Sequence, residues 1–318
     1  MPGSSVVLAE VVRSGFVEGV HRGSLVVLDA DGSVLAARGD VASPVFPRSC
    51  NKLMQATGLV ELGYAGREEQ LAIAAASHWG EPSHLDLVRG ILASAGLDES
   101  ALRTPPDWPY GPPVRDDLLR AGGGPEPIIM NCSGKHAAML AVCVERSWPL
   151  DDYRAPGHPL QQHLVATIAR MAGEKPVATG TDGCGAPVSA LSLTALARAF
   201  SGAVQADPSS PERIVADAMR AHPEYVGGFA SDVTLFMQGV PGLLVKDGAE
   251  GVYAAALDDG RAVAFKVDDG AARPRPPVLA AVLRSLGVEA AALDELAEVV
   301  LLGGGQPVGS VRAAAGLV

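Results

Sequence analysis

The sequence predicts a mixed α/β protein in which both ends of the chain build one antiparallel sheet and the middle forms a helical lobe. Short apolar runs separated by turn residues lie near the N-terminus and again from about residue 241 onward. Between them, from Ser49 to about Phe200, apolar residues recur mostly with helical spacing. We therefore expect a single domain over residues 1–318, with the sheet drawn from about 1–45 and 240–318 and the helical lobe from about 49–235.

The strands are predicted from turn residues between apolar runs. Residues 24–40, "SLVVLDADGSVLAARGD", hold two such runs about "DADG" and predict a β-hairpin. Residues 241–270 hold three runs separated by DG-type turns, which predicts a three-stranded meander. Residues 307–318 predict a closing strand.

Helical periodicity marks eight segments. They are residues 49–62, 68–78, 82–95, 134–146, 160–173, 189–202, 276–288 and 291–300. The proline-dense residues 103–117, "RTPPDWPYGPPVRDD", predict a packed loop because aromatic residues are interleaved with the prolines.

Composition and charge exclude several classes of protein. Hydrophobic residues make up 48% of the chain and charged residues 19%, which is typical of a folded protein and not of a disordered one. The longest apolar runs are too short to span a bilayer, and "MPGSSVVLAEVV" lacks the basic region of a signal peptide. We therefore expect a cytoplasmic protein without a membrane partner. A net charge of −11 argues against a nucleic-acid partner.

The four cysteines are expected to be thiols. A chain of this length without a secretory signal does not need a disulfide framework. Cys50, Cys132, Cys143 and Cys184 are therefore available as metal ligands or as small buried side chains.

Ser49 and Lys52 raise the possibility of a serine nucleophile. Pro47 disfavours helix at the residue before it, so a helix should begin at or just after Arg48, with Ser49 and Lys52 on one face. Backbone N–H groups at a helix start can stabilise an oxyanion, and a neutral lysine could take the serine proton. Lowering a lysine pKa by about three units costs roughly 4 kcal/mol and needs burial or a second cation. Taken alone, the motif is better explained by Ser49 acting as a helix cap.

Four further segments carry polar groups beside apolar runs. They are "AAASHWGEPSH" with Ser77, "IIMNCSGKHAAML" with Cys132, Lys135 and His136, "GTDGCGAPVSAL" with Asp182 and Cys184, and "RAVAFKVDDG" with Lys266. Each has a structural interpretation, as a helix cap, a buried histidine, a small buried thiol or a strand lysine facing water.

Taken together and in this order, the segments resemble the rhizobial, thermolabile type of L-asparaginase. The matching blocks extend over nearly the whole chain: "EGVHRGSLVVLDADG", "RSCNKLMQ", "SHWGE", "NCSGKHAAML", "HPLQQ", "TDGCGAPV" and "AFKVDDG". The resemblance implies hydrolysis of L-asparagine to L-aspartate and ammonia. It also implies homodimers and a fold like that of serine β-lactamases and penicillin-binding proteins, in line with the sheet and helical lobe predicted above.

The resemblance implies roles for ten residues. Two serine–lysine pairs map onto Ser49 with Lys52 and onto Ser77 with Lys266. A zinc ion near the active site would be held by Cys132, Lys135 and Cys184, and substrate would be bound by Arg48, His136 and Asp182. The chain has no CxxC motif, so three protein ligands would leave an open position on the metal, which suits an ion that orients substrate.

The implied chemistry is acyl transfer. Ser49 would attack the side-chain amide with Lys52 as base, and the second pair would relay a proton to the departing ammonia. Two lysines in one pocket repel each other as cations, which helps to keep one of them neutral. Which serine attacks stays open, as does asparagine against glutamine, since one methylene is worth only about 1 to 3 kcal/mol in a pocket.

Two other functions are less well matched. A penicillin-recognising enzyme needs Ser-x-Asn and Lys-Thr-Gly in addition to Ser-x-x-Lys, and neither "SDV" at residues 231–233 nor "KVDDG" at Lys266 fits. A non-catalytic zinc-binding protein on the same scaffold would be expected to have lost a catalytic position, and all four are present.

Overall fold

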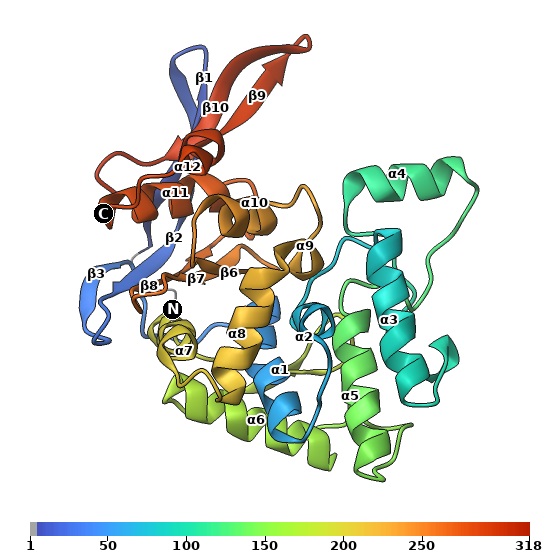
Figure 1. Cartoon of the computed structure of the whole chain (residues 1–318). Coiled ribbons are helices and arrows are strands. Elements are labelled where there is room, and N and C mark those ends of the chain that lie inside the picture. The colour runs from blue at the N-terminus through green and yellow to red at the C-terminus, as the bar shows by residue number, and fades with distance from the viewer. Residues whose placement is uncertain (1–4) are drawn as a thin grey trace.

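The computed structural model of the protein describes residues 5–318, and its centre is an antiparallel sheet with strand order β6-β7-β8-β2-β1-β10-β9. Strand β3 adds to β2 off this path. The strands are β1 (Val6–Arg13), β2 (Phe16–Leu28), β3 (Val34–Arg38), β6 (Leu244–Gly248), β7 (Val252–Ala256), β8 (Ala262–Val267), β9 (Glu298–Gly303) and β10 (Gln306–Ala313). Both ends of the chain therefore meet in one sheet, as predicted (Figure 1).

Two pairings join the N-terminal strands to the C-terminal ones. Strand β2 pairs with β8, from Gly23 opposite Val267 to Leu28 opposite Ala262. Strand β1 pairs with β10. Strands β6 and β9 are at the two edges of the sheet, so each pairs with a neighbouring strand on one side only.

The chain between the strands is mainly helical. The helices are α1 (Lys52–Glu61), α2 (Glu68–Ala74), α3 (Pro82–Ser94), α4 (Pro112–Arg120), α5 (Ser133–Glu145), α6 (Pro159–Ala172), α7 (Leu193–Gln205), α8 (Pro211–Ala221), α9 (Pro223–Val226) and α10 (Asp232–Gly239), with α11 (Arg275–Ser285) and α12 (Ala291–Leu296) inserted before β9. Short 3-10 turns lie at Arg48–Asn51 (η1) and Glu99–Ala101 (η2), and β4 (Thr179–Thr181) pairs with β5 (Pro187–Ser189).

Helix α1 joins the two hydrophobic cores. Its first half packs Leu53 and Met54 into the large core beneath the sheet. Its second half places Leu59 in the core of the helical lobe, which is shared with α2, α3 and α5. Lys52 is the first residue of α1 and is fully buried, so it lies where the sheet and the lobe meet.

Most predicted elements are present, and the exceptions have local reasons. Periodicity predicts one helix over residues 291–300, but α12 ends at Leu296 and the rest enters β9, which β10 pairs along its length. Residues 103–117 are predicted as a loop, yet α4 begins at Pro112, since proline suits the first turn of a helix. Strands β1 and β9 are absent from the predicted set.

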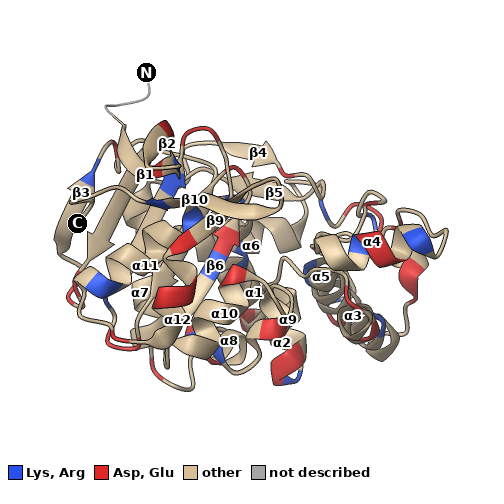
Figure 2. Cartoon of the chain, turned by 90° about the horizontal axis from the view of Figure 1, so that it is seen from above, with Lys and Arg blue, Asp and Glu red and all other residues tan. Residues whose placement is uncertain are grey.

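Charged side chains are spread over many elements. Figure 2 shows acidic and basic residues interspersed on helices and loops of both lobes. None of the helices within residues 5–318 is long and apolar enough to cross a membrane.

Candidate active site

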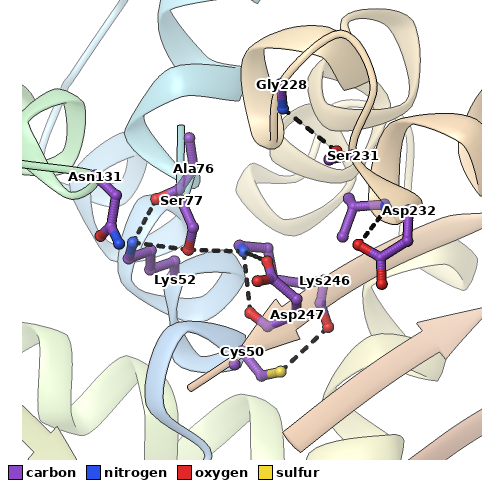
Figure 3. Close-up of polar contacts among 12 residues, drawn as sticks. Cys50, Lys52, Ala76, Ser77, Asn131, Gly228, Ser231, Asp232, Lys246 and Asp247 are labelled. Carbon is purple, nitrogen blue, oxygen red and sulfur yellow. Dashed lines mark hydrogen bonds and ion pairs between the residues drawn. The ribbon is translucent and has the colours of Figure 1, made fainter. Parts of the chain in front are cut away.

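Ser77 lies between two lysine side chains at the junction of the sheet and the helical lobe. Its Oγ is 3.2 Å from Lys52 Nζ and 2.9 Å from Lys246 Nζ (Figure 3). Ser77 follows α2, Lys52 begins α1, and Lys246 is on the edge strand β6. All three side chains are buried, so the contacts are shielded from water.

A close contact between η1 and β6 brings the two lysines together. A Cβ on Gly248 would lie 2.4 Å from Pro47 O, so only glycine allows β6 to approach η1 this closely. Cys50 Sγ donates to Lys246 O at 3.2 Å and ties the same two elements. The sequence Lys246-Asp247-Gly248 therefore supplies a lysine and the glycine that lets it reach the site.

The environment of Lys52 favours its neutral form. Burial is the largest effect and lowers its pKa; the neighbouring Cys132 opposes this, while the Lys246 and Lys135 cations add to the lowering. Lys52 Nζ also donates to the backbone carbonyl of Ala76. A lysine with a lowered pKa can take a proton from a serine.

Lys246 is paired with a carboxylate. Its Nζ donates to Asp247 Oδ1 and, at 3.0 Å, to Asp247 O. Burial alone would raise the pKa of Asp247, but the Lys246 and Arg275 cations outweigh it and lower this pKa to about 2. Asp247 is therefore ionised at neutral pH. Of the two lysines at Ser77, Lys246 has a carboxylate partner, whereas Lys52 is buried with its pKa lowered.

Ser49 is half-buried in η1, one turn before Lys52. The turn begins at Arg48, as predicted from Pro47. Arg48 has a φ of +51°, in the left-handed region that residues with a side chain rarely occupy. Such strained positions cluster at functional sites, and here the strain immediately precedes the predicted nucleophile.

The structure brings the three predicted zinc ligands together. Cys132 and Cys184 share a small buried cluster, and Lys135 Nζ is 3.4 Å from Cys184 Sγ. Cys132 caps α5 and Cys184 lies in the turn between β4 and β5. The Cys132 hydrogen bond and the Lys135 cation lower the pKa of Cys184 in spite of its burial, which favours the thiolate form.

The predicted substrate-binding residues lie in two places. Arg48 Nε donates to Asp182 Oδ1 at 2.7 Å, so these two are held together. His136 is fully buried beside the Cys184 sulfur, and burial lowers its pKa. Its Nδ1 is 2.7 Å from Tyr153 Oη, while its Nε2 is buried without a hydrogen-bond partner in the part of the chain that the structure describes. In residues 5–318 no three His, Cys, Asp or Glu side chains form a metal-binding group, so the candidate set depends on the Lys135 amine.

The predicted pairing of Ser77 with Lys266 is corrected by the structure. Lys266 Nζ donates to Glu250 O at 2.7 Å and to Val267 O at 3.3 Å, and its side chain is half-buried on β8. The amine at Ser77 belongs to Lys246. The sequence carries only a weak signal for it, the Lys-x-Gly spacing of Lys246-Asp247-Gly248. The structure adds that all five residues of β6 are buried.

A cavity of about 290 Å³ lies beside Ser77. Its lining combines aromatic and charged side chains: Ser77, Trp79, Tyr110, Asp232, Asp247 and Arg275. A pocket with a few convergent polar groups next to a buried serine is the usual setting for a small-molecule site.

A buried serine that touches two lysines beside a polar pocket is an arrangement suited to acyl-transfer hydrolases. The chain belongs to the L-asparaginase II family, whose sequence model matches residues 9–313. This confirms the family resemblance drawn from the sequence blocks and makes the protein an asparaginase-type amidohydrolase.

Solved structures with related architecture include β-lactamases. One is a β-lactamase from Mycobacterium bovis, with a TM-score of 0.39 and 16% identity, covering 84% of this chain and 95% of that chain. Another is a candidate β-lactamase from Bacteroides dorei, with a TM-score of 0.40 and 17% identity, covering 77% of this chain and 84% of that chain. Similarities this distant assign no residue roles. A search of curated proteins finds no match.

Proposed function

We propose that the protein hydrolyses L-asparagine to L-aspartate and ammonia through a serine nucleophile. Membership of the L-asparaginase II family supports the substrate class. The observation that carries the mechanism is the position of Ser77 Oγ, within 3.2 Å of Lys52 Nζ and 2.9 Å of Lys246 Nζ. A hydroxyl held by two amines can accept a proton from one side and donate one on the other.

The proposed reaction begins at Ser49. Ser49 Oγ forms a bond to the side-chain amide carbon while Lys52 takes its proton, and nearby backbone N–H groups stabilise the oxyanion. Lys52 then returns the proton through Ser77 to the amide nitrogen, the C–N bond breaks and ammonia leaves. Water attacks the resulting ester with Lys52 again as base, which releases aspartate and restores the Ser49 hydroxyl.

The two lysines have different tasks in this mechanism. Lys52, whose pKa is lowered by burial, is the base. Lys246 is held by Asp247 and stabilises negative charge that develops at Ser77. Environments that separate two similar groups in this way commonly distinguish the base from the acid in an active site.

We also propose that Cys132, Lys135 and Cys184 hold a zinc ion. The donor set fits, because two thiols and an amine converge and the Nε2 of neighbouring His136 is buried without a partner in the described residues. When bound, the ion would act as a Lewis acid that orients the substrate. The Arg48–Asp182 pair offers one positive and one negative group for the α-carboxylate and α-ammonium of an amino acid.

A second candidate reaction is hydrolysis of a β-lactam. Lys246-Asp247-Gly248 matches Lys-Thr-Gly at two of three positions, and Gly248 lies against Pro47, just before Ser49-x-x-Lys52. The test measures ammonia release from asparagine and from glutamine, together with opening of a chromogenic β-lactam. We expect asparagine to be the best substrate. Turnover of the β-lactam alone, or of none of the three, would contradict the proposal.

We further propose that the protein is a homodimer, as the family resemblance implies. Exposed apolar side chains on the projecting β1–β2 and β9–β10 hairpins support it, with Phe16 72% and Leu302 60% exposed (Figure 1). Light scattering should give twice the chain mass of 32.5 kDa, and replacing both residues with serine should lower it. A monomer at micromolar concentration would contradict this assignment.

A further inference from the structure

Ser77 lies at the end of a buried series of alternating charges. Lys246 Nζ contacts Ser77 Oγ at 2.9 Å and ion-pairs with Asp247 Oδ1. Arg275 Nη1 is 3.6 Å from Asp247 Oδ2, and Arg275 Nη2 is 3.8 Å from Asp232 Oδ2. Four elements thus contribute one continuous path: the segment after α2, strand β6, and helices α11 and α10.

The charged side chains of this path are buried, so each depends on its neighbour for charge compensation. The side chain of Lys246 is 0% exposed, and those of Asp247 and Arg275 are each 8% exposed. A buried charge that loses its partner is strongly destabilised. Each charge in the path therefore has to keep the opposite charge beside it. Figure 3 shows Lys246 and Asp247 extending from β6 toward Ser77, with Asp232 across from them.

The position of Arg275 is not explained by helix stability. It is the first residue of α11, where the helix dipole disfavours a cation. Its guanidinium lies over the Tyr253 ring at 5.4 Å, and its Nη1 donates to Gly248 O at 3.3 Å. These contacts aim the guanidinium at Asp247, at the end of β6 that carries the site.

Asp247 uses up the donors of Lys246. A lysine ammonium has three N–H donors. Asp247 O and Asp247 Oδ1 accept two of them, and Ser77 Oγ accepts the third. With all three N–H groups in place, Lys246 has no lone pair and cannot take a proton from Ser77. The Ser77 proton can then move only on the side that faces Lys52.

We infer that Asp247, held by Arg275, is a positioning residue that keeps Lys246 as a hydrogen-bond donor to Ser77 and so gives the proton relay a single direction. The inference rests on the proposed function, because it specifies how the serine–lysine relay works. It predicts that the Lys246 ammonium is destabilised once Asp247 is neutralised, since the Arg275 cation would then face it without a compensating charge. Other titratable groups packed against this path are Cys50 on η1, Asp232 on α10, Tyr253 on β7 opposite Asp247, and Tyr110.

The test compares Asp247→Asn with Asp247→Glu and with the wild-type protein. For asparagine hydrolysis we expect Asp247→Asn to lower kcat by about tenfold, less than the roughly 10²–10⁴-fold that loss of a proton-transfer group itself costs, with a smaller change in KM. The alkaline limb of its pH–rate profile should move about one unit to lower pH, because the ammonium needed at Ser77 is lost earlier. Asp247→Glu restores the charge and should return the limb toward the wild-type position. A folded Asp247→Asn protein with the wild-type profile would overturn the inference.

Two further measurements keep the outcome decisive. If Asp247→Asn does not fold, Asp247→Ser removes the same charge and should move the limb to lower pH as well, whereas the matched variant Asp294→Asn removes a carboxylate from an exposed ion pair with Arg284 and should not. If the wild-type protein releases no ammonia, the proposed function fails, and the ¹³Cε resonance of Lys246, assigned by its loss in Lys246→Arg, still reports the proton. An unchanged titration of that resonance in both Asp247→Asn and Asp247→Ser would reject the positioning role.

Discussion

Lys246 Nζ lies 2.9 Å from Ser77 Oγ, although 169 residues separate them in the chain. This contact exists because β6 is an edge strand that lies against η1, and because Gly248 allows the close approach. It corrects the predicted partner of Ser77 and defines which lysine should matter for activity.

Lys246→Met should lower asparagine turnover by about two orders of magnitude or more, the scale for loss of a donor that stabilises charge developing in the transition state. Lys266→Met is the matched control on the same meander, and it should retain most activity because Lys266 Nζ is bound to the carbonyl of Glu250. Ammonia release and circular dichroism on both proteins check this. The reverse ranking of the two variants would refute the role of Lys246.

Ser49→Ala should abolish ammonia release in a folded protein, because it removes the proposed nucleophile and leaves the Ser77–Lys246 contact intact. Mass spectrometry of rapidly quenched wild-type protein should locate the acyl group on the peptide that contains Ser49. If Ser49→Ala keeps more than a few per cent of turnover, or the acyl group is on Ser77, the nucleophile is Ser77.

Purified protein should contain close to one zinc ion per chain, and Cys184→Ala should lower that content. Cys143→Ala is the control, since Cys143 is a buried thiol on α5 within the core of the helical lobe. If the metal orients substrate, its loss should raise KM more than it lowers kcat. The site would be excluded if protein purified without chelators contained no zinc, or if Cys184→Ala and Cys143→Ala contained equal amounts.

Gly248→Ala should destabilise the protein by about 1–3 kcal/mol, because the new Cβ would meet Pro47 O and push β6 away from η1. Gly202→Ala on α7 is the contrasting change: nothing lies within 4 Å of the position that its methyl group would take, and a helical glycine replaced by alanine should gain roughly 0.5–1 kcal/mol. Urea unfolding midpoints measure both. Equal midpoints for the two variants would mean that the close approach of β6 to η1 is not required.

Stability should fall in acid partly because Asp247 becomes protonated. Its pKa in the folded protein is about 2, below the usual value of about 3.9, so its contribution is present above about pH 4 and is lost as pH falls toward 2. The shift corresponds to roughly 2–3 kcal/mol. Urea unfolding of wild type and Asp247→Asn should show a stability difference at pH 6 that shrinks by pH 3, whereas a constant difference would exclude Asp247 as its source.

Local sequence was sufficient where neighbours along the chain decide the structure. Apolar periods predicted the 24–40 hairpin, the 241–270 meander and most helices, since each depends on residues that are close in sequence. Pro47 predicted the start of η1 at Arg48 for the same reason. Ser49 and Lys52 were placed one turn apart by spacing alone.

Strand order decided what local patterns could not. Lys246 and Lys266 both follow apolar residues in the same meander and both precede an Asp and a Gly, so sequence gives little ground for choosing between them. In the folded chain β8 is paired on both sides, by β7 and β2, and Lys266 turns to the β6–β7 loop at Glu250. Strand β6 is at the edge, next to η1, and its lysine lies against Ser77. By itself the sequence predicted most elements and the family, and it supplied the candidate reactive residues. Tertiary structure alone decided their partners, because a contact across 169 residues depends on how the strands pair and pack.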